Sequence, residues 1–350
     1  MKFIFYLLFS FVFFISGAQD SLTFNNVIIL DVNDVESQGK TGTCWSYATS
    51  SFLESELIRM GEGQYDLSEM FVARQVYIQK ADNFIRRHGK ANFSEGSLSH
   101  DLINTINNHG IVPNSVFNGL TTNSNKHDHS ELSAVLEGYL NAIIKQEKPS
   151  VLWKKGYNAI LDVYLGEYPE LFEIDGKQFS PISFAKKINL NGDNYINLTS
   201  FTHHPFYNKF ILEVPDNWSN GSFLNIPIDE MLEITNKALN NGFSIAWDTD
   251  VSNKGFDAKK GLADITYEVT QEMRQDNFDN YTVTDDHLMH ITGLVKGSDG
   301  KSYFLVKNSW GNKIGLENYK GYILVSENYF KLHTISIMLH KDGVSKKYRK

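Results

Sequence analysis

The sequence is poor in cysteine, in basic charge and in any pattern typical of metal binding. Cys44 is the only cysteine in 350 residues, so no disulfide can form within the chain. The formal net charge of −8 gives no electrostatic basis for nucleic-acid binding. No cluster of side chains shows metal-ligand spacing, and we interpret His203 and His204, which precede Pro205, as structural. We therefore expect neither a metal nor a cofactor.

The chain also lacks an apolar run long enough to cross a membrane. Its longest low-charge run, residues 3–15, has 13 residues and follows a lysine, whereas a spanning helix takes roughly 20. A membrane anchor is thus the weaker interpretation. Because the small residues Ser16 and Ala18 follow the run, we interpret residues 1–18 as a secretory signal peptide. This predicts an exported protein, periplasmic or secreted, that is free of the membrane after cleavage.

What is present is a globular composition, with 41% hydrophobic and 21% charged residues and no internal repeat. Apolar periodicity predicts helices early in the chain and short strands in its last hundred residues. Helices are expected at 44–60, 68–81, 96–109, 132–146, 152–165 and 228–242, and strands within 287–297, 302–311, 319–326 and 334–340. This order indicates an α+β fold, with a cleft between a helical lobe and a β lobe.

Three regions follow from this pattern after the signal peptide. Residues 19–120 are predicted to form a helical lobe that carries the nucleophile, and residues 121–218 a mixed insertion region. Residues 219–350 are predicted to form a β-rich lobe, which ends in a C-terminal tail.

The lone thiol lies in the stretch QGKTGTCWSYA, at the expected start of the first helix. A lone cysteine is often a buried inert thiol or forms an intermolecular disulfide. At a helix N-terminus, however, the free N–H groups and the helix dipole favour the thiolate, which lowers the thiol pKa. Gly42 lets the backbone turn sharply, and the Gln38 amide could join the Cys44 N–H in an oxyanion hole. These residues indicate a nucleophile.

A thiolate nucleophile needs a histidine and a side chain that orients it. The tract TDDHLMHITGLV offers His287 and His290, which lie on opposite faces of a strand, so only one can face the thiol. Asn308 in LVKNSWG could orient the ring from the neighbouring strand, with Trp310 covering the contact.

QGKTGTCW, DHLMHITG and VKNSWG, in this order, resemble the three signatures of papain-like cysteine peptidases. That family places its oxyanion-hole glutamine six residues before the nucleophile, which is the spacing from Gln38 to Cys44. It also places a strand glycine six residues after the catalytic histidine. Gly293 lies six residues after His287 and only three after His290. The resemblance thus implies His287 as the catalytic histidine and Cys44, His287 and Asn308 as the triad.

Further segments resemble the bleomycin hydrolase and aminopeptidase C branch: LSEMFVARQVYIQKAD, FSEGSLSHDLINTINNHGIVP, NIPIDEMLEI, IAWDTDVS and TISIMLHKD. The implied fold is papain-like and two-lobed, with insertions. Thr41 stands where ordinary papain-like enzymes carry a disulfide cysteine, and the branch lacks that cysteine too. Gly96 and Ser97 resemble the family's strip that binds the substrate backbone, although Ser97 replaces a usual glycine; a plain helix start is the alternative.

The branch implies an aminopeptidase, in which the C-terminal carboxylate lies in the cleft and holds the free amine of a peptide substrate. Here the chain ends in DGVSKKYRK, whose cations would oppose an incoming ammonium. An endopeptidase with the same triad therefore stays an alternative, as does an inactive binding protein with this fold. The branch is often hexameric, so a homo-oligomer is implied by resemblance only.

Overall fold

The computed structural model describes residues 22–349 and contains both helices and a large mixed sheet. The helices are α1 (Cys44–Met60), α2 (Glu69–Arg86), α3 (Ser99–His109), α4 (Ser130–Ile143), α5 (Leu152–Leu165), α6 (Pro181–Lys187), α7 (Ile228–Asn240), α8 (Gln271–Asp279) and α9 (Glu327–His333). None of these is both long and apolar enough to span a membrane. The predicted signal peptide lies outside the described residues.

The strands in chain order are β1 (Phe24–Ile29), β2 (Phe172–Ile174), β3 (Lys177–Phe179), β4 (Tyr195–Thr199), β5 (Lys209–Ile211), β6 (Ser222–Asn225), β7 (Ile245–Thr249), β8 (Phe256–Asp257), β9 (Leu262–Ala263), β10 (His287–Gly297), β11 (Ser302–Lys307), β12 (Tyr322–Ser326) and β13 (Thr334–His340). The large sheet has the order β5-β6-β4-β13-β7-β10-β11-β12-β9-β8, with β1 paired to β10, while β2 and β3 form a separate hairpin. Strand β10 is therefore the centre of the β lobe.

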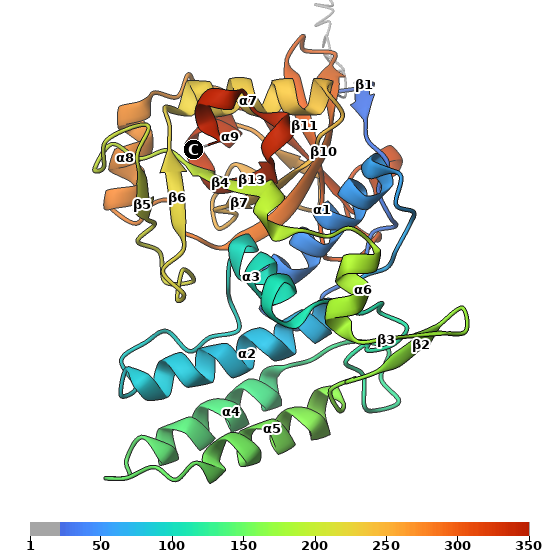
Figure 1. The fold of residues 1–350 in the computed structure, drawn as a ribbon. Helices are drawn as coiled ribbons and strands as arrows, with labels where there is room; N and C mark the ends of the chain where they lie inside the picture. The colour runs from blue at the N-terminus through green and yellow to red at the C-terminus, as the bar shows by residue number, and fades with distance from the viewer. Residues whose placement is uncertain (1–21, 350) are drawn as a thin grey trace, which may run out of the picture.

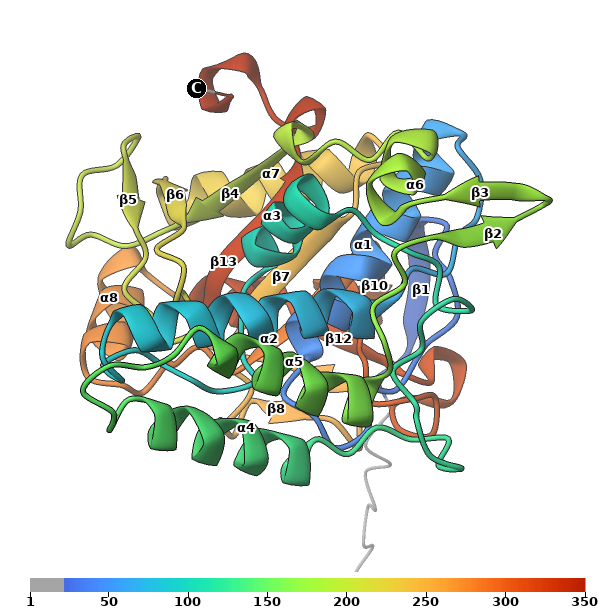
Figure 2. The same ribbon diagram turned by 60° about the horizontal axis from the view of Figure 1, so that its bottom comes forward.

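The helices form layers beside this sheet. Helix α1 packs against β10 and β7 and also contacts α2 and α3, so it lies between the two parts of the molecule (Figure 1). Helices α4 and α5 pack on α2 and form the outer layer, which Figure 2 shows from below. Helices α7 and α9 pack on one another, and α9 also contacts β11, β12 and β13. This arrangement brings the N-terminus of α1 to the start of β10.

Local sequence signals explain most helix ends. Helix α1 ends where Gly61 adopts a left-handed conformation (φ 77°) and closes the last turn with its N–H, as predicted. Ser68 caps α2 by accepting a hydrogen bond from the Phe71 N–H. The predicted helix at 96–109 begins three residues late, at Ser99, because Leu98 is the extended N-cap of α3, and Gly96 lines a cavity instead. The predicted α+β fold class is confirmed.

Candidate active site

Cys44 is the first residue of α1, and its side chain is 9% exposed. The residue before it, Thr43, provides no side-chain cap. No described residue accepts a hydrogen bond from the Cys44 N–H. The thiol lies against the backbone of Leu288, which directly follows His287 in β10. The helix start thus presents a thiol and a free N–H beside the strand that carries the predicted histidine.

Asn308 lies beside His287 and fixes the state of its ring. The Oδ1 atom of Asn308 is 2.8 Å from His287 Nε2 and also accepts a hydrogen bond from the Ser309 N–H at 2.8 Å. Because an N–H group already points at this atom, it must be the amide oxygen, and His287 Nε2 must donate to it. In the neutral ring, Nδ1 is then left as the acceptor. The Trp310 ring covers the imidazole at 4.7 Å between centroids.

His290 points elsewhere, as the strand period predicted. Its Nδ1 atom lies 2.9 Å from Ser51 Oγ on α1, and its ring packs against Phe52. It is fully buried, and burial lowers its pKa well below the ordinary value. His287 is therefore the member of the pair that lies beside Asn308.

Gln38 lies in the loop before α1 and is 7% exposed. Its Oε1 atom accepts a hydrogen bond from Ser309 Oγ at 2.6 Å, and its Nε2 donates to the Thr41 carbonyl at 2.6 Å. An amide nitrogen carries two hydrogens, so one remains for a further acceptor. These contacts tie the loop to the residue that follows Asn308.

The electrostatics of the substrate-free site differ from the expectation for a helix N-terminus. Burial raises the pKa of the Cys44 thiol to about 12, and the charges of Asp285, Asp216 and Asp248 raise it further. Burial also lowers the pKa of His287 to about 4, although Asn308 opposes this. Desolvation is the largest cause of both shifts. The charged forms of both groups, the Cys44 thiolate and the His287 imidazolium, are therefore unfavourable in this environment.

An open cavity of about 540 Å³ lies beside the thiol. Its lining comes from the start of α1, the loop before α3, helices α2 and α4, and two loops of the β lobe: Gly42, Cys44, Tyr77, Phe93, Ser94, Glu95, Gly96, Ser133, Leu136, Glu137, Asp216 and Asp286. Of the residues predicted to bind substrate, Gly96 is in this lining. Ser97 is buried; its hydroxyl donates to Asp101 Oδ2 and accepts from Trp218 Nε1. Trp310 lies over His287 and is outside this lining.

Sequence reasoning missed the acidic wall of this cavity. Glu95 holds the nucleophile loop, since its Oε2 accepts the Gly42 N–H at 2.6 Å and its Oε1 accepts from Ser133 on α4. Asp216 comes from the predicted insertion region, and Asp286 directly precedes His287. The dipeptide DD before His287 was visible in the sequence, whereas nothing near Asp216 signals proximity to residue 44.

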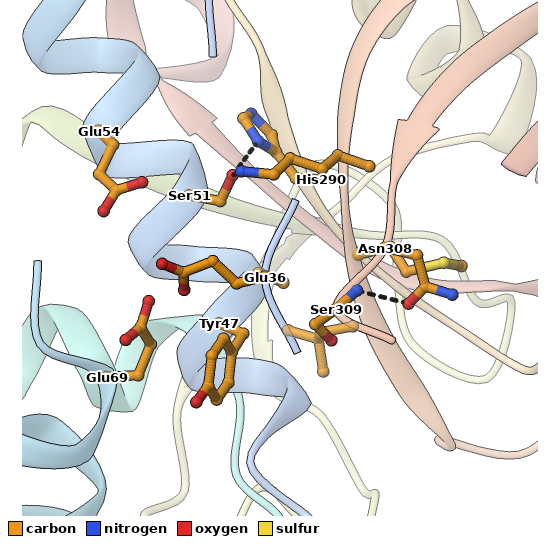
Figure 3. A pocket seen from close by; sticks show the side chains of 12 residues that line it. Glu36, Tyr47, Ser51, Glu54, Glu69, His290, Asn308 and Ser309 are labelled. Atoms are coloured by element: carbon orange, nitrogen blue, oxygen red, sulfur yellow. Dashed lines mark hydrogen bonds between the residues drawn. The ribbon is translucent and has the colours of Figure 1, made fainter. Parts of the chain in front are cut away.

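A second, smaller cavity of about 20 Å³ is lined in part by Asn308 and has room for about one water molecule. Figure 3 shows that the carboxyl groups of Glu36, Glu54 and Glu69 gather beside α1. Lys307 donates to Ser51 Oγ at 2.9 Å and is the cation of this group. Burial raises the pKa of Glu54 to about 8 and that of Glu69 well above its ordinary value. Burial therefore favours the neutral forms of Glu54 and Glu69, and Lys307 ties the strand that leads to Asn308 to α1.

One surface group has the geometry of metal ligands. His203 and His204 place their Nε2 atoms 3.1 and 2.8 Å from the two carboxylate oxygens of Glu213. However, the Gln275 amide nitrogen donates to His203 Nδ1, and its oxygen is held by the Thr202 N–H. The neutral His203 ring then carries its proton on Nε2 and donates it to Glu213. This arrangement fits a hydrogen-bonded group better than a cation site.

The described part of the C-terminal tail, up to Arg349, does not approach the cavity. Val344 and Tyr348 are buried, and Tyr348 donates to the Glu230 carboxylate on α7. Arg349 pairs with Asp342 at 2.9 Å. Figures 1 and 2 both place the C-terminal end on the far side of the molecule from α2 and α4, which line the cavity. The position implied by resemblance to the branch is therefore wrong for the residues up to Arg349, because these contacts hold the tail on α7.

Comparisons with known proteins show the fold and the class of enzyme. Residues 167–350, more than half of the chain, match the family model of the Peptidase C1-like family. Aminopeptidase G of Lactobacillus delbrueckii subsp. lactis is 24% identical, covering 91% of this chain and 83% of the relative. Aminopeptidase C of Streptococcus thermophilus is 23% identical, with 90% and 82% covered.

The crystal structure of PepW from Lactobacillus rhamnosis HN001 shares the fold, with a TM-score of 0.74 at 21% identity over 93% of this chain and 84% of that one. Fold and family together define a papain-like cysteine peptidase. Within that class, the chain belongs to the Peptidase C1-like family. The predicted family and enzyme class are confirmed; the roles of individual site residues and the domain boundaries stay predictions.

Proposed function

We propose that this protein is an aminopeptidase that hydrolyses peptide bonds through Cys44, His287 and Asn308. The observation that carries the proposal is the hydrogen bond from His287 Nε2 to Asn308 Oδ1, formed in the strand segment that packs on the Cys44 thiol. It leaves His287 Nδ1 as the proton acceptor. The relatives named as aminopeptidases, aligned over about nine tenths of the chain, support the substrate class.

In the proposed reaction, Cys44 Sγ attacks the carbonyl carbon of the scissile bond while its proton passes to His287 Nδ1. The resulting oxyanion takes hydrogen bonds from the Cys44 N–H and the remaining Gln38 amide hydrogen. His287 then protonates the leaving amine, and the C–N bond breaks to give a thioester. Water, deprotonated by His287, hydrolyses the thioester and regenerates the thiol. Asn308 keeps the ring in the required tautomer throughout.

The test uses Cys44→Ala and a fluorogenic aminoacyl amide. We expect hydrolysis to fall to background while the melting temperature changes little, because the 9%-exposed thiol packs at the cavity edge. Activity retained in this variant would refute the nucleophile. Thiol-directed epoxide labelling of the wild type, followed by peptide mapping, should mark Cys44.

An endopeptidase is the second candidate, and the position of the tail favours it. Since residues up to Arg349 pack on α7, they leave the cavity open to longer peptides. Free-amine and N-acetylated substrates of the same sequence distinguish the two candidates. A wild type that cleaves both equally would be an endopeptidase. Export is part of the same proposal and rests on residues 1–18; fractionation of cells that express the full chain tests it.

A further inference from the structure

An aminopeptidase must recognise the positively charged α-amine at the end of its substrate. An anion close to the nucleophile would provide that recognition, because the charged amine is what a blocked or internal peptide lacks. The described residues of the tail do not supply it, since those up to Arg349 lie on α7. The following inference rests on the proposed aminopeptidase function and concerns the group that replaces the tail.

The cavity beside Cys44 contains four carboxylates, and only some can accept a new donor. Glu95 already binds the Gly42 N–H and the Ser133 hydroxyl, one with each oxygen. Asp286 accepts from the Ser252 N–H with Oδ2 and from Thr284 Oγ1 with Oδ1. Both side chains are thus engaged in holding loops. This leaves Asp216 and Glu137 as the carboxylates with unused oxygens.

Asp216 is held in one orientation with one oxygen free. Its Oδ1 accepts hydrogen bonds from Asn92 Nδ2 at 3.0 Å and Ser94 Oγ at 3.3 Å. No described residue donates to Oδ2, and no described cation lies within 4.0 Å of the carboxylate. Glu137, in contrast, is exposed on α4 and has no hydrogen bond that fixes it among residues 22–349. Asp216 is the preorganised group.

The absence of a side chain at Gly96 makes room for the free oxygen of Asp216, Oδ2. A β-carbon at position 96 would overlap Asp216 Oδ2. The φ angle of Gly96 is not in the left-handed region, so the backbone alone does not require glycine here. The glycine instead leaves room for the carboxylate above the main chain that lines the cavity. A substrate that lies along Gly96 would bring its terminal amine to Oδ2.

Burial raises the pKa of Asp216, whereas the charge of Lys80 and the hydrogen bonds from Ser94 and Asn92 lower it. Lys80 is buried, donates to the Gly96 carbonyl from below, and attracts the Asp216 charge from beyond ion-pair distance. Glu95 and Asp286 add negative charge to the same cavity. The open side of Asp216 is therefore favourable for a cation.

We propose that Asp216 binds the α-ammonium group of the substrate through Oδ2 and so selects peptides with a free N-terminus. Asp216 is a specificity-determining residue, because its ligand is the amine next to the scissile carbonyl. A bound ammonium also cancels part of the negative field at Cys44, since the Asp216 charge is among those that raise the thiol pKa. The correct substrate thereby assists formation of the thiolate.

The test compares substrates with and without the amine in matched variants. Leucyl-7-amido-4-methylcoumarin and its 4-methylpentanoyl analogue differ only in the α-amine. Asp216→Asn keeps an acceptor for Asn92 but removes the charge. We expect its kcat/KM for the leucyl substrate to fall by roughly 30-fold, with the analogue changed by less than about threefold. Glu137→Gln removes a charge from the same cavity and should change the ratio of the two by less than about threefold.

A purely structural role makes a different prediction, because damage to the cleft would slow both substrates. Alkylation of Cys44 by iodoacetamide should be at least as fast in Asp216→Asn as in the wild type, since removal of a negative charge favours the thiolate. Should Asp216→Asn fail to fold, Asn92→Ala releases Oδ1 and should lower the same ratio by a smaller factor.

Three results would overturn the assignment: an unchanged substrate ratio in Asp216→Asn, an equal loss in Glu137→Gln, or loss of the amine preference when residues 349–350 are removed. Failure of the proposed function itself is visible in the wild type alone. A wild type that cleaves N-acetylated and free-amine peptides equally well would refute the aminopeptidase and, with it, the role of Asp216.

Discussion

The buried carboxylates beneath Asn308 should make the stability of this protein depend on pH, and Glu54 allows a direct test. Glu54 is 4% exposed, and its Oε1 accepts the Leu67 N–H at 2.8 Å. Burial raises its pKa from 4.5 to about 8, while the Lys307 charge opposes this only in part. The folded protein therefore favours the neutral carboxyl group. Glu54→Gln retains the oxygen that binds Leu67 and cannot ionise.

The sign and size follow from proton linkage. A raised pKa in the folded state stabilises the fold below pH 4.5, and this contribution is lost as the pH rises to about 8. Each factor of ten in proton affinity corresponds to about 1.4 kcal/mol, so about 5 kcal/mol is the upper bound. Glu36 and Glu69 share the charge of Lys307 and adjust when Glu54 is removed. We therefore expect Glu54→Gln to gain about 2 to 3 kcal/mol at pH 8.5 and close to none at pH 4.

Urea unfolding at pH 4 and pH 8.5, followed by tryptophan fluorescence, measures this difference in the free energy of unfolding. Glu233→Gln is the matched control, because Glu233 is exposed on α7 and pairs only with Lys237. It should show no such trend. A Glu54→Gln variant whose stability relative to wild type is the same at both pH values would refute the reasoning, as would a loss of stability at pH 8.5.

Two further changes test the cleft. Asn308→Ala removes the acceptor of His287 Nε2, so kcat should fall roughly 10- to 100-fold with little change in KM, and steady-state kinetics on the leucyl amide checks this. A kcat within twofold of wild type would contradict the orienting role. Gly96→Ala should displace Asp216 and lower kcat/KM for free-amine substrates, whereas Gly138→Ala, with open space around it, should leave activity unchanged and raise the melting temperature slightly. Equal activity in both glycine variants would show that the overlap at position 96 has no consequence.

Much of the fold was predictable because local signals and tertiary packing agree. The apolar period from residue 44 to 60 and Gly61 gave α1, and the β-rich runs gave β10 to β13. Helices α4 and α5 also matched the predicted helical patches. The apolar pattern did not predict where α4 and α5 lie in the fold. Helix α4 packs on α2 and lines the cavity next to Cys44, although it belongs to the predicted insertion region.

The candidate site, like the fold, was predictable only in part. The order of its motifs and the spacing from Gln38 to Cys44 pointed to the nucleophile, and the strand period separated His287 from His290. The thiol pKa was predicted with the wrong sign, because a helix start is visible in the sequence whereas burial is not. The hydrogen bond that Asn308 accepts from His287 could not be predicted, because it depends on the register of β10 and β11, which pairs His290 with Lys307.

The sequence by itself determined the class of chemistry, since residue types and short spacings specify which groups can act as nucleophile, base and orienting amide. Only the tertiary structure decided which charges surround them. Asp216 contacts Gly96, which lies 120 residues earlier in the chain, and the tail up to Arg349 packs on α7 instead of in the cavity. Both outcomes depend on long-range packing and on the desolvation of charged groups, which no local pattern encodes.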